Sequence, residues 1–233
     1  YLACAQAGFY MVPINWHLAG PEIAYILEDS GAKAFIASGS VPAMEEACLK
    51  AVSAINFPTS GCISTTPIEG FISLDNFLAD HPTSNPEDRT AGQVMNYTSG
   101  TTGHPKGVKS ALSQTGTPVG TLKMIGDGLS GMLSIEPGGK TLLVGPIYHS
   151  AQWAFSFLPM LAGSSIVMRH KFDEAETLRL IDNHQITNIH LVPTQFTRML
   201  RLDEEEKEKF QGKSLNVVWH GAAPCPPQIK KQM

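Results

Sequence analysis

A run of small and hydroxyl side chains around one lysine is the part of this sequence best suited to chemistry. Residues 97–108 read Tyr-Thr-Ser-Gly-Thr-Thr-Gly-His-Pro-Lys-Gly-Val and follow the apolar, β-prone stretch 93–97. Glycines let backbone N–H groups approach a ligand, hydroxyls donate hydrogen bonds, and Lys106 adds a mobile positive charge. This combination predicts a phosphate-binding loop.

The loop does not follow the Walker pattern. That pattern needs a glycine immediately before its lysine and a serine or threonine after it, whereas Pro105 precedes Lys106 and Gly107 follows it. Pro105 has no N–H and biases His104 towards extended backbone, so no helix should begin at the lysine. We expect an irregular loop between two extended segments. An ordinary Ser/Thr/Gly surface loop is the less favoured alternative.

Two further segments carry residues suited to a ligand site. The first, at 145–151, reads Gly-Pro-Ile-Tyr-His-Ser-Ala and follows an expected strand. An aromatic side chain and a histidine at a strand end suit a ligand pocket, although a lone histidine is more often structural. The second, at 220–224, reads His-Gly-Ala-Ala-Pro, and its small residues would let a flat ring lie against the backbone. An ordinary strand-to-helix turn is the alternative there.

The run 97–108 resembles the phosphate-loop signature of the adenylate-forming (ANL) superfamily, which includes acyl-CoA synthetases, luciferases and adenylation domains of peptide synthetases. Nearly the whole chain fits one stretch of these enzymes, from Gly-Phe-Tyr-Met-Val-Pro-Ile-Asn at 8–15 to the turn at 221–224. The segment His-Gly-Ala-Ala-Pro-Cys-Pro at 220–226 is most similar to the corresponding segment of fatty-acid and related acyl-CoA synthetases. The resemblance implies an α/β fold, an incomplete N-terminal AMP-binding domain with mostly parallel sheets flanked by helices.

The resemblance also implies roles for individual residues. Lys106 and His149 would be catalytic, Lys106 by helping pyrophosphate leave and His149 by lying beside the carboxylate being activated. The positions implied to bind ATP are Thr98, Ser99, Gly100, Thr101, Thr102, Gly103 and Lys106 at the phosphates, with Ala222, Ala223 and Pro224 at adenine. The positions implied to face the acyl group are His149, Ala151, Thr194, His220 and Gly221.

The implied reaction uses ATP, Mg²⁺ and coenzyme A. A carboxylate attacks the α-phosphate to give an acyl-adenylate and pyrophosphate, and the thiol of coenzyme A then displaces AMP. The chain ends before the family's Tyr-Gly-x-Thr-Glu segment, whose glutamate helps to hold Mg²⁺, and before the small C-terminal domain. We therefore expect a fragment that is inactive alone, with a first α/β portion at 1–80, a linker at 81–92 and the site-bearing portion at 93–233.

The segment 148–150 also bears on the substrate. Relatives that activate amino acids place an aspartate here, but this chain has Tyr-His-Ser, which would leave a substrate ammonium unpaired in a low-dielectric pocket. A plain carboxylic acid fits better, and the small Ala151 suggests room for an aliphatic or bulky polycyclic tail. Two alternatives stay open: transfer of the acyl group to a carrier protein or an oxidase step, and a non-catalytic module that keeps only the scaffold.

Composition excludes several other classes of function. The 233 residues are 42% apolar and 16% charged, and the net charge of −4 with no basic cluster argues against nucleic acid as a partner. No apolar run is long enough for a membrane span, and no signal peptide is visible. Four cysteines and eight histidines are scattered, which predicts no structural metal and favours a cytosolic setting. Peripheral membrane attachment and oligomeric state stay open.

The elements that must position these segments alternate between strands and helices, as in a parallel α/β sheet. We predict helices at 21–30 and 42–53 and a capped helix beginning at Asp173. Strands are predicted at 34–37, 141–144, 166–168, 189–192 and 217–219, and a solvated helix or loop at 203–209. The glycines at 126–131 match a dinucleotide-binding spacing, but no strand precedes them, so we interpret the match as an accident.

Overall fold

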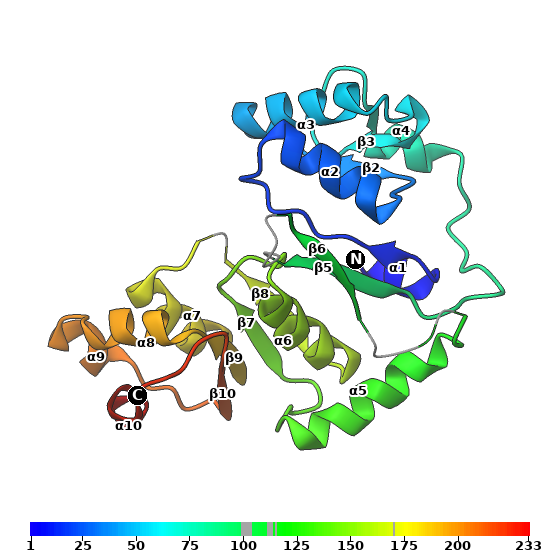
Figure 1. Ribbon diagram of the computed structural model, residues 1–233. Coiled ribbons are helices and arrows are strands. Elements are labelled where there is room, and N and C mark those ends of the chain that lie inside the picture. The colour runs from blue at the N-terminus through cyan, green and yellow to red at the C-terminus, as the bar shows by residue number, and fades with distance from the viewer. Residues whose placement is uncertain (99–103, 111–113, 115, 170) are drawn as a thin grey trace. The chain divides into compact units, whose positions relative to one another are not determined.

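The computed structural model describes residues 1–98, 104–110, 114, 116–169 and 171–233. The chain folds as two compact units, Tyr1–Gly116 and Thr117–Met233 (Figure 1). The stretch 81–92, predicted as a linker, lies inside the first unit. The strands that flank the phosphate loop therefore belong to the first unit, and the other two candidate segments belong to the second.

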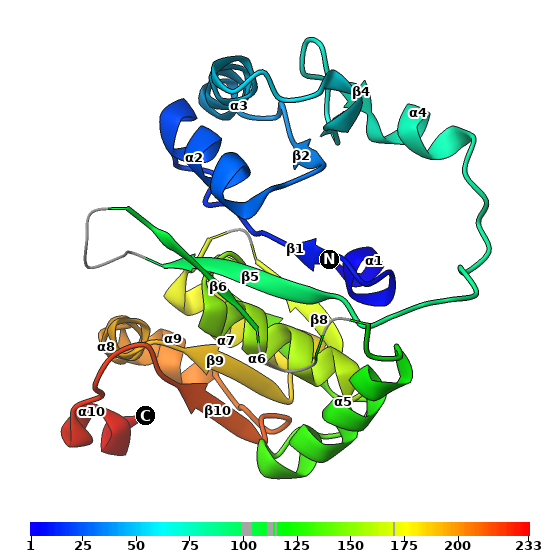
Figure 2. The same cartoon turned by 45° about the vertical axis from the view of Figure 1, so that its right-hand side comes forward.

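The first unit contains two small sheets. In chain order its elements are α1 (Leu2–Gln6), β1 (Tyr10–Met11), α2 (Gly20–Ser30), β2 (Phe35–Ala37), α3 (Pro42–Ala54), the 3₁₀ turn η1 (Thr59–Gly61), β3 (Cys62–Ser64), β4 (Ile72–Ser73), α4 (Leu74–Ala79), β5 (Gln93–Thr98) and β6 (Lys106–Lys109). Strands β2, β3 and β4 pair in parallel. Strand β5 pairs with β1 in parallel and with β6 in antiparallel orientation, and the β5–β6 hairpin is clear in Figure 2.

Helix α2 forms where the sequence predicts it. The Glu22 carboxylate accepts a hydrogen bond from the Ala19 N–H at 2.8 Å, which satisfies a donor at the start of the helix, and Pro21 suits the first turn. Gly31, with φ of 63°, ends the helix in the left-handed conformation that glycine adopts without strain. The buried face of α2 packs against α3 in one apolar cluster: Ile23, Ala24, Leu27, Phe35, Ala47, Cys48 and Ala51.

The second unit is built on one parallel sheet. In chain order its elements are α5 (Gly120–Met132), β7 (Lys140–Leu143), α6 (Ser150–Leu161), β8 (Ser165–Met168), α7 (Glu174–His184), β9 (Asn188–Leu191), α8 (Pro193–Leu200), α9 (Glu204–Lys209), β10 (Val217–His220) and α10 (Pro227–Gln232). The strand order is β10-β9-β7-β8, and every pairing in it is parallel. The four strands predicted in this part of the sequence are confirmed to within one residue at each end.

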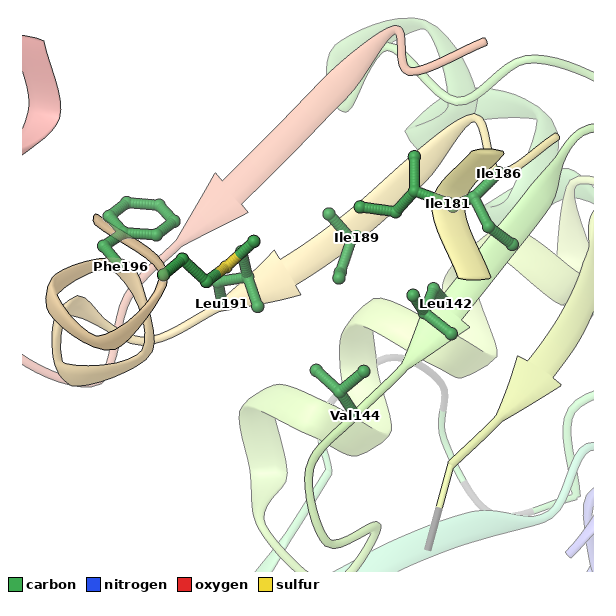
Figure 3. Close-up of a cluster of buried hydrophobic side chains, with 8 residues drawn as sticks. Leu142, Val144, Ile181, Ile186, Ile189, Leu191 and Phe196 are labelled. Atoms are coloured by element: carbon green, nitrogen blue, oxygen red, sulfur yellow. The ribbon is translucent and has the colours of Figure 1, made fainter. Parts of the chain in front are cut away.

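Helices of the second unit cover opposite faces of its sheet. Side chains alternate between the faces of a strand. Ile189 and Leu191 of β9 join Leu142 of β7 in a core cluster with Ile181 of α7 and Phe196 of α8 (Figure 3). The next side chain of β9, His190, instead contacts α6. The loops after β7 and β9 thus lead to helices on different faces, which makes this pair of neighbouring strands the topological switch point of the sheet.

Local signals for α7 and α9 are also confirmed in the structure. The Asp173 carboxylate caps α7 by accepting a hydrogen bond from the Glu176 N–H at 2.8 Å. The Glu176 carboxylate itself forms an ion pair with Arg169 at 2.6 Å. Helix α9 has no buried residue and carries ion pairs between its own lysines and glutamates, as the charge pattern indicates.

The glycines at 126–131 lie inside α5 and not in a strand-to-helix turn, so the dinucleotide spacing is an accident. Packing explains one of them. A Cβ built on Gly126 would lie 2.5 Å from the backbone carbonyl carbon of Leu161, whereas a Cβ on Gly128 would meet nothing within 4 Å. Gly126 thus allows α5 to approach the end of α6.

This contrast within one helix gives a matched pair of variants. Gly126→Ala should destabilise the protein by about 1–3 kcal/mol because backbone must move. Gly128→Ala should stabilise it by about 0.5–1 kcal/mol because alanine is the better helix former. Thermal unfolding followed by circular dichroism should show midpoints that shift in opposite directions. Equal shifts would contradict the packing explanation.

Candidate functional site

The phosphate-loop segment is a β-hairpin connection. Strands β5 and β6 pair in antiparallel register, and Thr98 opposes Lys106 as the pair next to the loop. The prediction that Lys106 lies in an extended segment, with no helix beginning there, is confirmed. Thr98 and Lys106 are both exposed. The loop residues predicted to hold phosphate, Ser99, Gly100, Thr101, Thr102 and Gly103, lie outside the described residues.

Helix α2 anchors both sides of this hairpin connection. The Tyr97 hydroxyl donates to the Asp29 carboxylate at 2.6 Å, and the Tyr25 hydroxyl donates to the Pro105 carbonyl at 3.0 Å. Tyr25 and Asp29 are four residues apart on α2 and so share a face. The Tyr25 ring also contacts the His104 ring, with 5.3 Å between centroids. Sequence reasoning missed this anchor because its partners lie 68 and 80 residues apart.

The environment of Tyr97 keeps its phenol protonated. Burial, followed by the hydrogen bond to Asp29 and the charge of that carboxylate, raises the pKa of Tyr97 well above its ordinary value. An ionised phenol could not donate to Asp29 and would be repelled by it. The anchor therefore depends on the neutral form of the tyrosine.

Stability should consequently depend on Tyr97 at alkaline pH. Below a pH of about 10 both the folded and the unfolded chain hold the phenolic proton, and the contribution is fully present. Above it the unfolded chain loses the proton first, so stability falls as the pH rises towards the raised folded pKa. The thermal unfolding midpoint should therefore fall less steeply with rising pH in Tyr97→Phe than in wild type. The range to measure is about pH 9 to about pH 11, which spans the ordinary tyrosine pKa of about 10. The control Tyr10→Phe, which removes an exposed phenol, should fall as steeply as wild type.

In the second unit, the predicted acyl-site residues gather at one edge of the sheet. Parallel strands end at the same edge, and the switch point between β7 and β9 lies there. His149 is exposed at the N-cap of α6 after β7, and Thr194 is exposed in the first turn of α8 after β9. His220 is the last residue of β10, Gly221 follows it, and Ala151 lies in the first turn of α6. The structure thus brings this predicted set together within one unit.

The predicted adenine residues form the turn after β10. Ala222, Ala223 and Pro224 are all exposed. Ala222 has φ of 65°, a left-handed conformation that costs a residue with a Cβ about 1–2 kcal/mol. Strained backbone of this kind is concentrated at ligand-binding turns. This turn is in the second unit, whereas the phosphate hairpin is in the first.

A buried polar pair beside this edge was not predicted. The Gln152 amide nitrogen of α6 lies 3.1 Å from Nδ1 of His190 on β9, and the His190 ring stacks on Phe155 at 4.7 Å between centroids. His190 is 2% exposed, and its Nε2 has no hydrogen-bond partner among the described residues. Burial, together with the charge of His220, lowers the pKa of His190. A histidine within an apolar strand was a signal that sequence analysis could have used.

Other features of the described residues do not add to the site. Hollows of about 280 Å³ beside Leu27 and Phe57 and about 380 Å³ beside Arg179 and Lys213 contain none of the predicted site residues. Across 1–98, 104–110, 114, 116–169 and 171–233, no group of three or more His, Cys, Asp or Glu side chains could hold a metal ion. None of the helices described combines the length and apolar character needed to cross a membrane.

Comparison with known proteins identifies the family. The sequence model for the family described as AMP-binding enzyme matches residues 1–233. The chain belongs to this family. Indoleacetate–CoA ligase of Aromatoleum aromaticum is similar to it, with 27% identity over 99% of this chain and 44% of the relative. So is a dioxo-octahydro-indenyl-propanoyl:CoA ligase of Rhodococcus jostii, with 28% identity over 100% of this chain and 46% of the relative.

Solved structures agree on the fold of this AMP-binding enzyme chain. The N-terminal domain of FACL13 from Mycobacterium tuberculosis superposes with a TM-score of 0.69 at 24% identity, over 96% of this chain and 53% of that one. The amide bond synthetase McbA from Marinactinospora thermotolerans gives a TM-score of 0.76 at 20% identity, over 100% of this chain and 45% of that one. The α/β architecture expected from the resemblance is therefore confirmed. The chain spans about half the length of the curated relatives it matches.

Proposed function

We propose that the full-length protein activates a carboxylic acid with ATP and transfers the acyl group to coenzyme A. In the first step a carboxylate oxygen bonds to the α-phosphorus and the bond to pyrophosphate breaks. In the second the thiol attacks the acyl carbonyl carbon, loses its proton, and AMP leaves. The observation that carries the proposal is the β5–β6 hairpin, in which Lys106 opposes Thr98 beside a loop of glycines and hydroxyls.

The residues of this chain would act on ATP mainly by positioning and charge. Backbone N–H groups and hydroxyls of 98–103 would hold the β- and γ-phosphates, and Lys106 would neutralise the charge that grows on pyrophosphate as it leaves. The small side chains of Ala222, Ala223 and Pro224 suit contact with a flat adenine ring. Mg²⁺ bound with ATP would supply further positive charge at the phosphates.

The acyl group would lie at the switch point of the second unit. His149 would face the carboxylate, with Ala151, Thr194, His220 and Gly221 around the acyl group. No acidic side chain stands at 148–150 to pair with a substrate ammonium, which supports a plain carboxylic acid. The names of similar relatives include an indole acid, a cyclic dioxo acid and long-chain fatty acids, so a bulky acyl group is the proposed class.

Pyrophosphate exchange tests the proposed first step. The full-length protein should incorporate labelled pyrophosphate into ATP only when a suitable acid is present, across a panel of aromatic, alicyclic and long-chain acids. Exchange with no acid in the panel, combined with no heat of ATP binding by calorimetry, would favour the non-catalytic alternative.

The acceptor needs a separate comparison. Thioester formation with coenzyme A should exceed that with a phosphopantetheinyl carrier protein at equal thiol concentration. If the carrier protein were the better acceptor, the proposed adenylation step would stand, but coenzyme A would not be the acceptor.

A further inference from the structure

The Nε2 atom of His190 is a polar atom for which the packing of the second unit provides no partner among the described residues. Every other part of this side chain is accounted for: Nδ1 faces Gln152, and the ring stacks on Phe155 with 10° between planes. Nε2 is buried without a partner among the described residues. A buried polar atom left unpaired carries a desolvation cost that a bound partner would recover.

The contact with Gln152 decides what Nε2 can offer. Because the amide nitrogen of Gln152 faces Nδ1, that ring nitrogen accepts the hydrogen bond and carries no proton. The lowered pKa of His190 keeps the ring neutral, so its single proton is on Nε2. Nε2 is therefore a hydrogen-bond donor, and it suits an oxygen acceptor.

Gly221 is the residue of the proposed acyl site that lies beside Nε2, a nitrogen that is itself closed to solvent. A Cβ built on Gly221 would lie 3.5 Å from Nε2, and no other atom of the described residues outside its neighbours in the chain would be within 4 Å. A methyl-sized group would therefore fit beside Gly221 in ordinary van der Waals contact with this nitrogen. Phe155 also contacts the Trp219 ring at 4.9 Å between centroids, so flat apolar surfaces surround the polar atom.

We propose that His190 is a specificity residue whose Nε2–H donates a hydrogen bond to a carbonyl oxygen on the acyl tail of the substrate. The preferred acids would be ring-bearing acids with a ketone remote from the carboxylate, in place of a purely hydrocarbon tail. This inference rests on the proposed adenylation function and narrows its substrate class.

Matched acids that differ only in the ketone test the proposal. Pyrophosphate exchange by the full-length protein would be compared for para-acetylphenylacetic against para-ethylphenylacetic acid, and for oxocyclohexylpropanoic against cyclohexylpropanoic acid. Wild type should favour the oxo acid by at least about tenfold in kcat/KM in one pair or more, because a site built for a hydrogen bond rejects an analogue that cannot make it.

Two variants assign that preference to Nε2. His190→Phe keeps an aromatic ring stacked on Phe155 but removes the donor, and it should lose the oxo preference while keeping exchange with the hydrocarbon acid. Gly221→Ala keeps His190 and places a methyl group over Nε2 at 3.5 Å, and it should also reduce the preference. The control His184→Phe changes an exposed histidine at the end of α7 and should leave the preference unchanged.

The outcomes separate the two proposals. Exchange with both acids of every pair at equal kcat/KM would mean that no oxygen of the acyl tail pairs with Nε2, and it would overturn the role of His190 but not adenylation. The role of His190 would also be overturned if His190→Phe kept the preference for the oxo acid while exchange with the hydrocarbon acid was intact. Absence of exchange with every acid would remove the proposed function and this inference with it.

Discussion

In Lys106→Ala of the full-length protein, acid-dependent pyrophosphate exchange should fall by about 100-fold or more, while the affinity for the acid changes little. Removing one preorganised donor that stabilises developing charge costs about two to three orders of magnitude in rate. Lys106 begins β6 opposite Thr98, so its side chain starts at the end of the phosphate loop, and none of the residues assigned to the acyl group is in this hairpin. Exchange rates at saturating acid, with acid binding by calorimetry, would measure both effects.

Lys109 provides a matched control on the same strand. It is exposed, ends β6, and places its ammonium 5.1 Å from the centroid of the Tyr10 ring. Lys109→Ala therefore removes the same charge at a point three residues further from the loop. It should change the exchange rate by less than about threefold, because an exposed cation–π contact contributes little. Equal losses in both variants would point to general electrostatic attraction of ATP. Unchanged exchange in Lys106→Ala would remove its catalytic assignment.

Local signals in the sequence were sufficient for several elements of the fold, including α2, α7 and the strands of the second sheet. Pro21 and Gly31 delimit α2, Asp173 caps α7, and apolar runs mark the strands of the second sheet. Each of these signals acts through steric or hydrogen-bonding effects within a few residues, so one sequence is enough to detect it. The extended backbone at Lys106 was predictable for the same reason, from Pro105.

Pairings between distant residues were not predictable in this way. The bond between Tyr97 and Asp29 and the contact of Gln152 with His190 join different elements, and nothing near either residue in the sequence specifies its partner. The resemblance to a family supplied the positions expected at the site, but it carried no information on these side chains.

Gly107→Ala should lower both stability and adenylation, which connects the hairpin geometry to the proposed chemistry. A Cβ on Gly107 would lie 2.0 Å from Cε of Met95 and 3.1 Å from Cζ of Tyr97. The Met95 methyl can rotate away, but the Tyr97 ring is held by its bond to Asp29, so relief must displace that ring or β6 itself. Overpacking of this kind costs about 1–3 kcal/mol, and a shift of the loop by about 1 Å can reduce the rate up to 100-fold.

The physical route of this effect can be tested in a second background. If the methyl group acts by displacing Tyr97 from Asp29, Gly107→Ala should lower the free energy of unfolding by less in a Tyr97→Phe background, where that bond is already absent. A double-mutant cycle should measure this coupling between the two changes. Gly128→Ala, which adds the same methyl group where nothing lies within 4 Å, should leave exchange unchanged. Additive effects of Gly107→Ala and Tyr97→Phe would show that the glycine serves Met95 packing alone, and that the anchor on α2 does not set the position of the loop.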